Sequence, residues 1–206
     1  MGRKVVVHTF LTLDGVMQAP GSPDEDTAGG FTHGGWSVPY WDDAMGEVMG
    51  TYMRPGEFEL LLGRRTYEHM AAHWPNAPEE EQPEVMNTAP KHVASRTLDR
   101  VDWENSKLIP GDVAEYVRAL KEQDGPEIQV HGSGDLIQTL LKEDLVDEYR
   151  LWIYPLLLGE GKRLFAEGTA PLGLRVAEVK NVASGPTFVK FERAGEIEQG
   201  SYMGEG

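Results

Sequence analysis

Short runs of apolar residues recur along the chain, and they alternate with segments in which the apolar residues are spaced as on one face of a helix. The first pattern is typical of buried strands and the second of amphipathic helices. The strand pattern predicts strands at 4–11, 58–63, 127–132, 148–159, 174–182 and 187–193, and a short strand plus a turn at 91–98. Pro155 marks a bulge or an end of the strand at 148–159. The helical pattern predicts helices at 41–53, 64–74, 111–123 and 135–144.

The order of these elements predicts the fold class. Strands and helices alternate through most of the chain, which is typical of an α/β protein with a mostly parallel central sheet and helices on both faces. The last two strands follow each other without a helix, so we expect an antiparallel edge at the C-terminal side. We predict one domain over residues 1–206, ending in a loose tail at 195–206. In such sheets, ligands bind at the carboxyl ends of the strands.

Composition and charge narrow the classes of function. The 19 basic and 34 acidic residues give a net charge of −15, which disfavours nucleic-acid binding and means that an anionic ligand needs a local basic or amide-rich pocket. The chain has no cysteine, which excludes disulfides, thiolate metal sites and cysteine nucleophiles. No apolar run approaches the roughly 20 residues of a membrane helix, and the N-terminus does not read as a signal peptide. We therefore expect a cytoplasmic protein without a membrane partner.

Three junctions between a predicted strand and the segment that follows it carry residues suited to phosphate. Glycine allows close backbone approach, the first amides of a helix attract anions, and arginine adds charge. The junctions are Gly63-Arg64-Arg65-Thr66, Ser95-Arg96-Thr97 and Gly132-Ser133-Gly134-Asp135-Leu136. Taken singly, each could be a solvated helix start or an ordinary turn. Together, phosphate-suited junctions on successive strands fit a dinucleotide better than a single phosphate.

The third junction begins like the dinucleotide fingerprint G-x-G-x-x-G. It lacks the third glycine, and Tyr154 stands near the position where the fingerprint has an acidic residue. The Rossmann motif therefore fails in detail, although small residues at a strand end and free amides at a helix start remain.

Four segments together resemble the dihydrofolate reductase superfamily: "TLDGVMQ", "LLLGRRTYE", "SRT" and "HGSGDLIQTLLKEDLVDEYRLWIYPLLLGEGKRLF". Within it, the chain is most similar to the reductase domain of riboflavin biosynthesis (the RibD C-terminal domain) and its free-standing relatives. The resemblance covers residues 4–193. It implies a three-layer α/β/α fold with an eight-stranded sheet, NADPH as cofactor, hydride transfer, and a homodimer.

The resemblance also implies roles for particular residues. The substrate would be a small heterocycle, such as 5-amino-6-(5-phosphoribosylamino)uracil or dihydrofolate. The implied cofactor-binding residues are Thr12, Asp14, Gly15, Gly63, Arg64, Arg65, Thr66, Ser95, Arg96, Gly132, Ser133, Gly134, Asp135 and Leu136. Ser95 and Arg96 would face the 2′-phosphate, and Thr12, Asp14 and Gly15 would lie near the nicotinamide. A simple turn is the alternative for Asp14-Gly15.

A reductase also needs a proton donor and a substrate pocket. Asp42, Asp43 and His131 are the candidate catalytic residues; helix capping is the alternative for the two aspartates, and packing for the histidine. Trp41 and Tyr154 are candidate substrate-binding residues, with core packing as the alternative for Tyr154.

Two further interpretations remain to be weighed. His69 and His73 lie four positions apart, but the segment lacks the glutamate of the metalloprotease motif and no third ligand is evident, so we expect no metal site. The alternative to a reductase is a protein of another class, which binds NADPH as a sensor or carrier without turnover.

Overall fold

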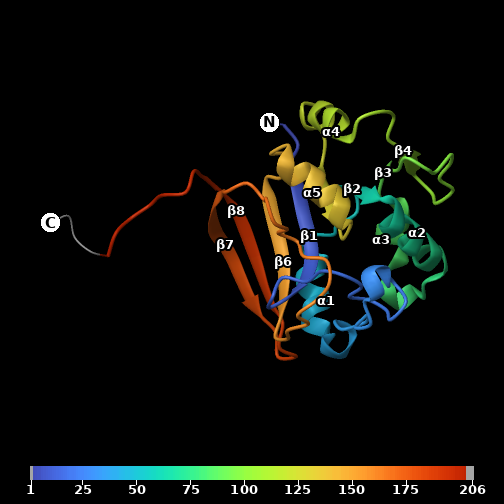
Figure 1. The fold of residues 1–206 in the computed structure, drawn as a ribbon. Coiled ribbons are helices and arrows are strands. Elements are labelled where there is room, and N and C mark those ends of the chain that lie inside the picture. The colour runs from blue at the N-terminus through green and yellow to red at the C-terminus, as the bar shows by residue number, and fades with distance from the viewer. Residues whose placement is uncertain (1, 203–206) are drawn as a thin grey trace.

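One eight-stranded sheet organises the computed structural model, which describes residues 2–202. The strands are β1 (Val5–Thr12), β2 (Phe58–Gly63), β3 (Lys91–Ala94), β4 (Ser106–Leu108), β5 (Glu127–His131), β6 (Glu148–Tyr154), β7 (Gly173–Asn181) and β8 (Thr187–Gly195). Their order across the sheet is β4-β3-β2-β5-β1-β6-β8-β7 (Figure 1). All neighbours from β4 to β6 pair in parallel, whereas β8 pairs antiparallel with both β6 and β7. This confirms the predicted mostly parallel sheet with an antiparallel C-terminal edge.

Helices cover both faces of the sheet. On one face α4 (Val113–Lys121) and α5 (Gly134–Lys142) pack on apolar side chains of β1, β5 and β6. On the other face α1 (Asp43–Gly50) packs against β6 and β8, and α2 (Arg64–His73) and α3 (Pro83–Thr88) pack against β2 and β3. Side chains along a strand alternate between the two faces of the sheet, and helices cover both faces, so side chains of the central strands are buried on both sides. The result is the predicted three-layer arrangement.

The long loop after β1 folds back onto the protein. The Trp36 indole donates a hydrogen bond to the Gln18 carbonyl at 2.8 Å and meets the Tyr154 ring edge-on, with 5.1 Å between ring centroids. Phe31 is buried in the same cluster. Gly161 packs so closely on this loop that a Cβ there would lie 2.7 Å from a Val16 methyl. The loop is therefore a packed part of the structure.

Two predicted strand ends agree with the structure. The strand in 91–98 ends at Ala94 and a turn follows, because the Ser95 hydroxyl accepts hydrogen bonds from the Thr97 and Leu98 amides. The strand in 148–159 ends at Tyr154, immediately before Pro155, which has no amide to donate to a ladder. β4 and α3 were not predicted.

The tail predicted at 195–206 begins at Gly195, which is the last residue of β8. Residues 196–202 form no helix or strand, and residues 203–206 of the predicted tail lie outside the described residues. No helix within residues 2–202 is long and apolar enough to cross a bilayer.

Candidate functional site

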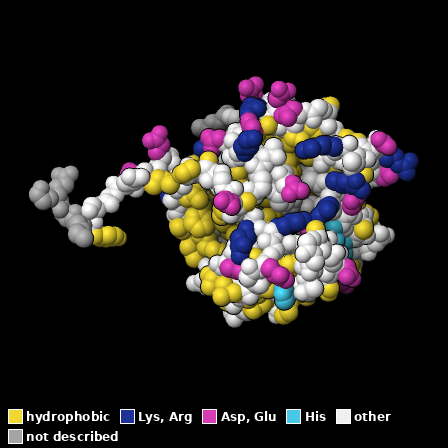
Figure 2. Space-filling view, viewed as in Figure 1, with side chains coloured by type: hydrophobic (Ala, Val, Ile, Leu, Met, Phe, Trp, Pro, Cys, Tyr) yellow, Lys and Arg dark blue, Asp and Glu magenta, His cyan; other side chains and the backbone are white. Residues whose placement is uncertain are grey.

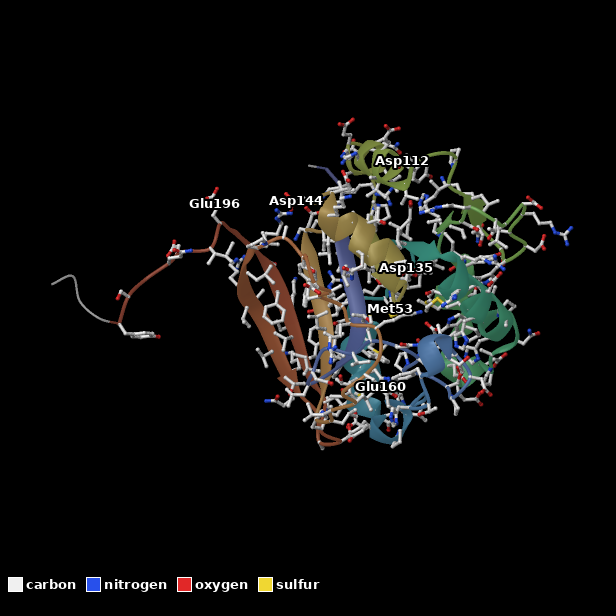
Figure 3. All side chains as sticks on the ribbon, viewed as in Figure 1. Met53, Asp112, Asp135, Asp144, Glu160 and Glu196 are labelled. Carbon is white, nitrogen blue, oxygen red and sulfur yellow. The ribbon has the colours of Figure 1, made fainter. Side chains whose placement is uncertain are left out.

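A large cleft lies at the carboxyl ends of β1, β2, β3 and β5. Its volume is about 900 Å³, and it is bordered by the starts of α2 and α5 and by residues 17–26 of the long loop. Met53 and Asp135, labelled in Figure 3, line it from different parts of the chain. In Figure 2, Lys and Arg side chains gather near the middle of the face shown, among acidic ones. The structure thus has a cleft at the edge where the sequence predicts a ligand.

All three phosphate-suited junctions meet in this cleft. The predicted cofactor-binding residues that line it are Gly63, Arg64, Arg65, Thr66, Ser95, Arg96, Gly132, Ser133, Gly134, Asp135 and Leu136. They come from segments far apart in the sequence, and the parallel pairing of β3, β2 and β5 brings them to one edge. His131 lines the cleft as well.

The first and third junctions are joined directly through Ser133. Its hydroxyl accepts a hydrogen bond from the Gly63 amide at 2.9 Å and lies 2.9 Å from the Thr66 hydroxyl, to which it donates. Gly132, with φ of 54°, and Ser133, with φ of 62°, are both left-handed, which bends the backbone sharply ahead of α5. This bend brings the start of α5 close to the start of α2.

The two helices that begin at this contact have free first turns. Neither Gly63 before α2 nor Ser133 before α5 makes a side-chain capping hydrogen bond, whereas Asp42 caps α1 and Asp112 caps α4. The first amides of a helix have no partner within the helix and carry partial positive charge. Two such helix starts side by side form a concave group of donors suited to an anion.

Arginines add charge around this group of amides. Arg64 contacts Glu68 at 2.8 Å and the Thr97 hydroxyl at 2.5 Å, which links the first junction to the second. Arg65 forms an ion pair with Asp26 at 3.3 Å. Arg96 is exposed and makes no hydrogen bond or ion pair with any residue from 2 to 202 that the structure records. Its guanidinium is therefore available to a ligand.

Asp26 closes the cleft on the loop side. Its carboxylate binds Arg65 and also Lys162, whose ammonium nitrogen lies 2.5 Å away. Lys162 lines the cleft too. One carboxylate thus holds two cations that border the cleft and ties the long loop to α2.

Two histidines form the polar part of the cleft wall on β1 and β5. His8 and His131 are register partners, and their ring centroids lie 4.9 Å apart. Burial lowers the pKa of His131 to about 4, with the Arg150 guanidinium acting in the same direction. Burial also lowers the pKa of His8 well below its usual range, and the nearby His131 and Arg150 add to the shift. Both rings are therefore neutral near pH 7.

A chain of polar contacts runs from His131 along the sheet. The Gln129 amide nitrogen donates to the Tyr52 carbonyl at 2.7 Å and to Glu127 at 2.6 Å, which leaves its oxygen to accept from His131 Nε2 at 2.8 Å. This fixes the tautomer in which Nε2 carries the proton and Nδ1 is an acceptor. A neutral ring with its proton held by Gln129 is a weak acid, which argues against the predicted role of His131 as a proton donor.

Thr12, Asp14 and Gly15 do not line the cleft. The Asp14 carboxylate accepts hydrogen bonds from the Thr12 hydroxyl and from the Gly159 amide at 2.8 Å, and these contacts lower its pKa to about 2. The Gly15 amide bonds back to the Thr12 carbonyl at 2.9 Å. The geometry corresponds to the alternative interpretation, a turn, which here anchors the segment after β6.

Four other candidates also lie away from the cleft lining. Asp42 caps α1 by accepting from the Met45 amide at 2.9 Å, and its hydrogen bonds with Ser184 and Met45 lower its pKa, so it is an ionised acceptor. Asp43 lies in the first turn of α1, where negative charge is stabilised. Trp41 is exposed, and Tyr154 is buried in the cluster around Trp36. The structure does not bring these residues together with the junctions.

Several residues of the cleft were not predicted from the sequence. They include His8 and Phe10 on β1, Asp26 on the loop, Met49 on α1, and Met53. His8 carried a visible signal, because a polar ring stood inside a run of β-branched residues. The others followed from packing that no local pattern shows.

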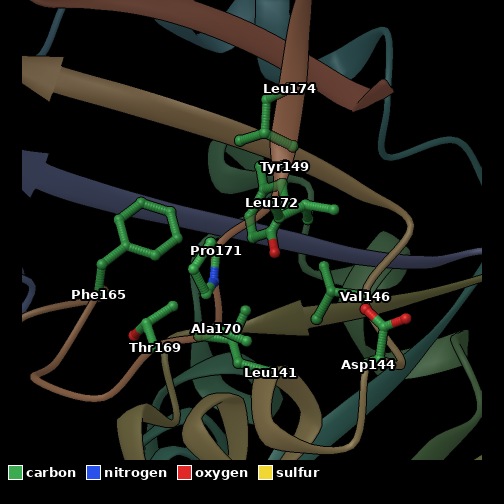
Figure 4. A pocket seen from close by; sticks show the side chains of 10 residues that line it. All are labelled: Leu141, Asp144, Val146, Tyr149, Phe165, Thr169, Ala170, Pro171, Leu172 and Leu174. Carbon is green, nitrogen blue, oxygen red and sulfur yellow. The ribbon is translucent and has the colours of Figure 1, made fainter. Parts of the chain in front are cut away.

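A second, smaller cavity of about 260 Å³ lies beside α5, β6 and the segment before β7 (Figure 4). It is lined mainly by apolar side chains, with Asp144 and Thr169 as polar members. No predicted site residue lines it. Among residues 2–202, no group of three or more His, Asp or Glu side chains is placed to hold a metal ion.

The fold is that of a dihydrofolate-reductase-like α/β protein. The family model described as the RibD C-terminal domain matches residues 3–188, and the chain belongs to that family, which is reductase-like. This confirms the predicted family.

Two curated relatives and two solved structures are similar to this chain. The uncharacterized Bacillus subtilis protein YyaP is 32% identical over 136 residues, which cover 64% of this chain and 72% of that protein. YwjB of the same organism is 28% identical over 185 residues, with coverage of 87% and 92%. A Shewanella sp. PV-4 protein whose name links it to riboflavin biosynthesis superposes with a TM-score of 0.64 at 23% identity, covering 94% and 99%. A pyrimidine reductase-like protein of Corynebacterium diphtheriae gives 0.63 at 10% identity, covering 96% and 93%. At these identities, the two structures show the fold alone.

Proposed function

We propose that this protein is an NADPH-dependent reductase that transfers hydride to a small heterocyclic substrate held in the cleft. The observation that carries the proposal is the pair of uncapped helix starts, α2 and α5, joined through Ser133 and bordered by Arg64 and Arg96. Membership of a reductase-like family supports a nicotinamide cofactor. We choose NADPH over NADH because the positive charge of Arg96 suits the 2′-phosphate that only NADPH carries.

The residues of the cleft fit such a cofactor. The amides at 133–136 and 64–66 would bind the pyrophosphate, because they are donors at free helix starts. Gly132 has a left-handed φ of 54°, which favours glycine, and the glycines at 63 and 132 have no side chain to hinder approach to the backbone. Ser95 and Arg96 would bind the 2′-phosphate, as the hydroxyl and the unpaired guanidinium suit a phosphate monoester.

The other end of the cleft suits the reaction. Phe10, Met49 and Met53 give it apolar walls that exclude water, and His8 and His131 give it neutral hydrogen-bonding groups. When bound, the nicotinamide supplies the hydride. The protein orients the two reactants and keeps the site dry. Since neither histidine is charged near pH 7, we infer that they bind by hydrogen bonds and do not act as stored acids.

Two measurements on one preparation test the proposal. The purified protein is titrated with NADPH and with NADH, and NADPH oxidation is followed with a panel of pterins, aminopyrimidines and quinones. We expect saturable binding with preference for NADPH, and turnover with at least one ring of the panel. Absence of NADPH binding would exclude both a reductase and a carrier.

A second candidate function is a sensor or carrier that binds NADPH without turnover. One observation favours it: Asp42 and Asp43 lie away from the cleft lining, and both histidines in it are neutral. Tight NADPH binding without oxidation by any member of the panel would favour this candidate.

We also infer a homodimer. The edge strand β7 exposes Leu174, Val176 and Val179, and exposed apolar residues on an edge strand favour association. Light scattering should give twice the mass of the chain. A monomer at micromolar concentration would contradict this.

A further inference from the structure

We propose that His8 is the residue that recognises the substrate, and that one of its ring nitrogens binds an uncharged hydrogen-bonding group on the edge of a small ring. The inference rests on the proposed function in one respect: the cleft must hold a small-molecule substrate. It adds the contact residue and the chemical class of the edge that is bound.

The observation behind the proposal is that His8 has two buried ring nitrogens without hydrogen-bond partners. His8 is 2% exposed, and neither ring nitrogen has a hydrogen-bond partner among residues 2–202. Leaving a buried polar group unpaired is strongly unfavourable, and native proteins satisfy most of them. Because His8 lines the cleft, a ligand there could supply the missing partners.

The neighbours of His8 have no spare hydrogen-bonding capacity directed to it. His131 donates to Gln129, and Gln129 uses its amide on the Tyr52 carbonyl and on Glu127. Arg150, the register partner of His8 on β6, binds Glu127 and Glu148. Among residues 2–202, the buried ring nitrogens without a hydrogen-bond partner belong to His8 and Trp152, and of these two rings only His8 lines the cleft.

The charges near His8 set the class of ligand. Arg150 on the neighbouring strand is paired with Glu127 and Glu148, so neither of these carboxylates is free to bind a cation, and the ring of His8 is neutral. The acidic side chains that line the cleft are Glu25, Asp26, Asp112 and Asp135, which come from the long loop and from the segments that begin α4 and α5. None of the four lies on β1 or β5. A cationic ring is therefore disfavoured at this end of the cleft.

The neutral imidazole also sets the pattern of the edge. One of its nitrogens is a donor and the other an acceptor. Because the two nitrogens point away from each other, one ring edge pairs with only one of them: a carbonyl would accept from the protonated nitrogen, or an N–H group would donate to the other. Phe10, two residues further along the same face of β1, offers an apolar surface for the ring itself.

Three variants test the assignment. His8→Phe removes both nitrogens but keeps a ring, and His8→Gln keeps one donor and one acceptor. His33→Gln is the matched control, because His33 is exposed, pairs with Glu160 and does not line the cleft. The probes are 6-aminouracil, which is uncharged, and protonated 2,4-diaminopyrimidine, which is a cation. Binding is followed by nitrogen NMR of labelled histidine rings and by calorimetry, with and without NADPH.

We expect 6-aminouracil to shift the His8 ring signals of the wild type and to bind more tightly than the cation. His8→Phe should weaken this binding at least about tenfold, the effect of one lost buried hydrogen bond, while His8→Gln and His33→Gln stay within about threefold. Ligand-free His8→Phe should also unfold about 2–4 °C higher, since it removes two unpaired buried groups.

Three results would overturn the assignment: unchanged probe binding in His8→Phe, which is also what a water-filled site would give; stronger binding of the cation; or no binding of 6-aminouracil to the wild type. NADPH affinity is measured in the same samples. If the wild type does not bind NADPH, the proposed function is refuted. If only the His8 assignment is wrong, NADPH binding is unaffected.

Discussion

Arg150 on β6 forms two hydrogen bonds with Glu127 on β5, at 2.5 and 2.8 Å, although β1 lies between their two strands. The pair thus crosses the central strand of the sheet beside His8. The Arg150 guanidinium also binds Glu148 at 2.7 Å and stacks on the Tyr52 ring, 4.2 Å from the ring centroid. This charge helps to keep both histidines of the cleft neutral, so the network connects the stability of the sheet to the chemistry of the site.

Removing the guanidinium should destabilise the protein strongly. We expect Arg150→Met to lower the free energy of unfolding by roughly 3–5 kcal/mol, because it leaves Glu127 and the buried Glu148 without their main partner. The matched control is Arg118→Met, which breaks an exposed pair with Glu143 and should cost less than about 1 kcal/mol. Urea unfolding of both variants measures the difference. Equal effects would show that the buried network contributes no more than a surface pair.

Stability should depend on pH through the two histidines. The pKa of His131 is about 4 in the folded protein and about 6.5 in the unfolded chain, so between these values the unfolded chain binds more protons. Stability is therefore complete above about pH 6.5 and falls as the pH drops toward about 4, by about 1.4 kcal/mol per pH unit for one histidine. His8 acts in the same direction. Denaturant unfolding across this range should show a smaller slope in His131→Gln, and an unchanged slope would contradict the shifted pKa.

Arg96 should distinguish the two nicotinamide nucleotides. We expect Arg96→Ala to weaken NADPH binding about tenfold to a hundredfold and to leave NADH within about twofold, because a charge-assisted contact to the 2′-phosphate is lost. Arg100→Ala is the control, since Arg100 is exposed, pairs with Asp102 and does not line the cleft. Calorimetric titration of the wild type and both variants with NADPH and with NADH gives the affinities to compare. Equal losses for both nucleotides would exclude a contact to the 2′-phosphate.

Asp26 should compete with the cofactor for Arg65 and Lys162. We expect Asp26→Asn to tighten NADPH binding about fivefold, because removing one negative charge near the cleft is worth on the order of 1 kcal/mol. The gain should shrink at high salt. Asp24→Asn is the control, because Asp24 is exposed and does not line the cleft. Weaker binding in Asp26→Asn would mean that Asp26 acts mainly by holding the loop in place.

The sequence predicted what depends on local pattern. The alternation of apolar runs and helical spacing gave the layers of the fold, and glycines and arginines after Leu62 and Ala94 marked two of the junctions. β4 was missed because its three residues are too few to show alternation. α3 was missed because it has only six residues and begins with a proline.

The site was predicted less completely, for physical reasons. His8 lies next to His131 only because β1 and β5 pair in the register Val7 to Val130, and register is a long-range property. Asp42 has the chemistry of an acid but accepts backbone hydrogen bonds from Met45 and Ser184, and a carboxylate used as a cap has the same local sequence signature. The junctions were visible because each is a short contiguous run of small, hydroxyl or arginine residues directly after a predicted strand, which the local sequence shows.

The most direct test of the account is a crystal structure of the protein with NADPH. The account predicts the pyrophosphate within hydrogen-bond distance of the amides at 133–136, the 2′-phosphate against Ser95 and Arg96, and the nicotinamide at the end of the cleft that holds Phe10 and His131. A cofactor bound outside the cleft, or one reversed so that its adenosine lies beside His131, would contradict it.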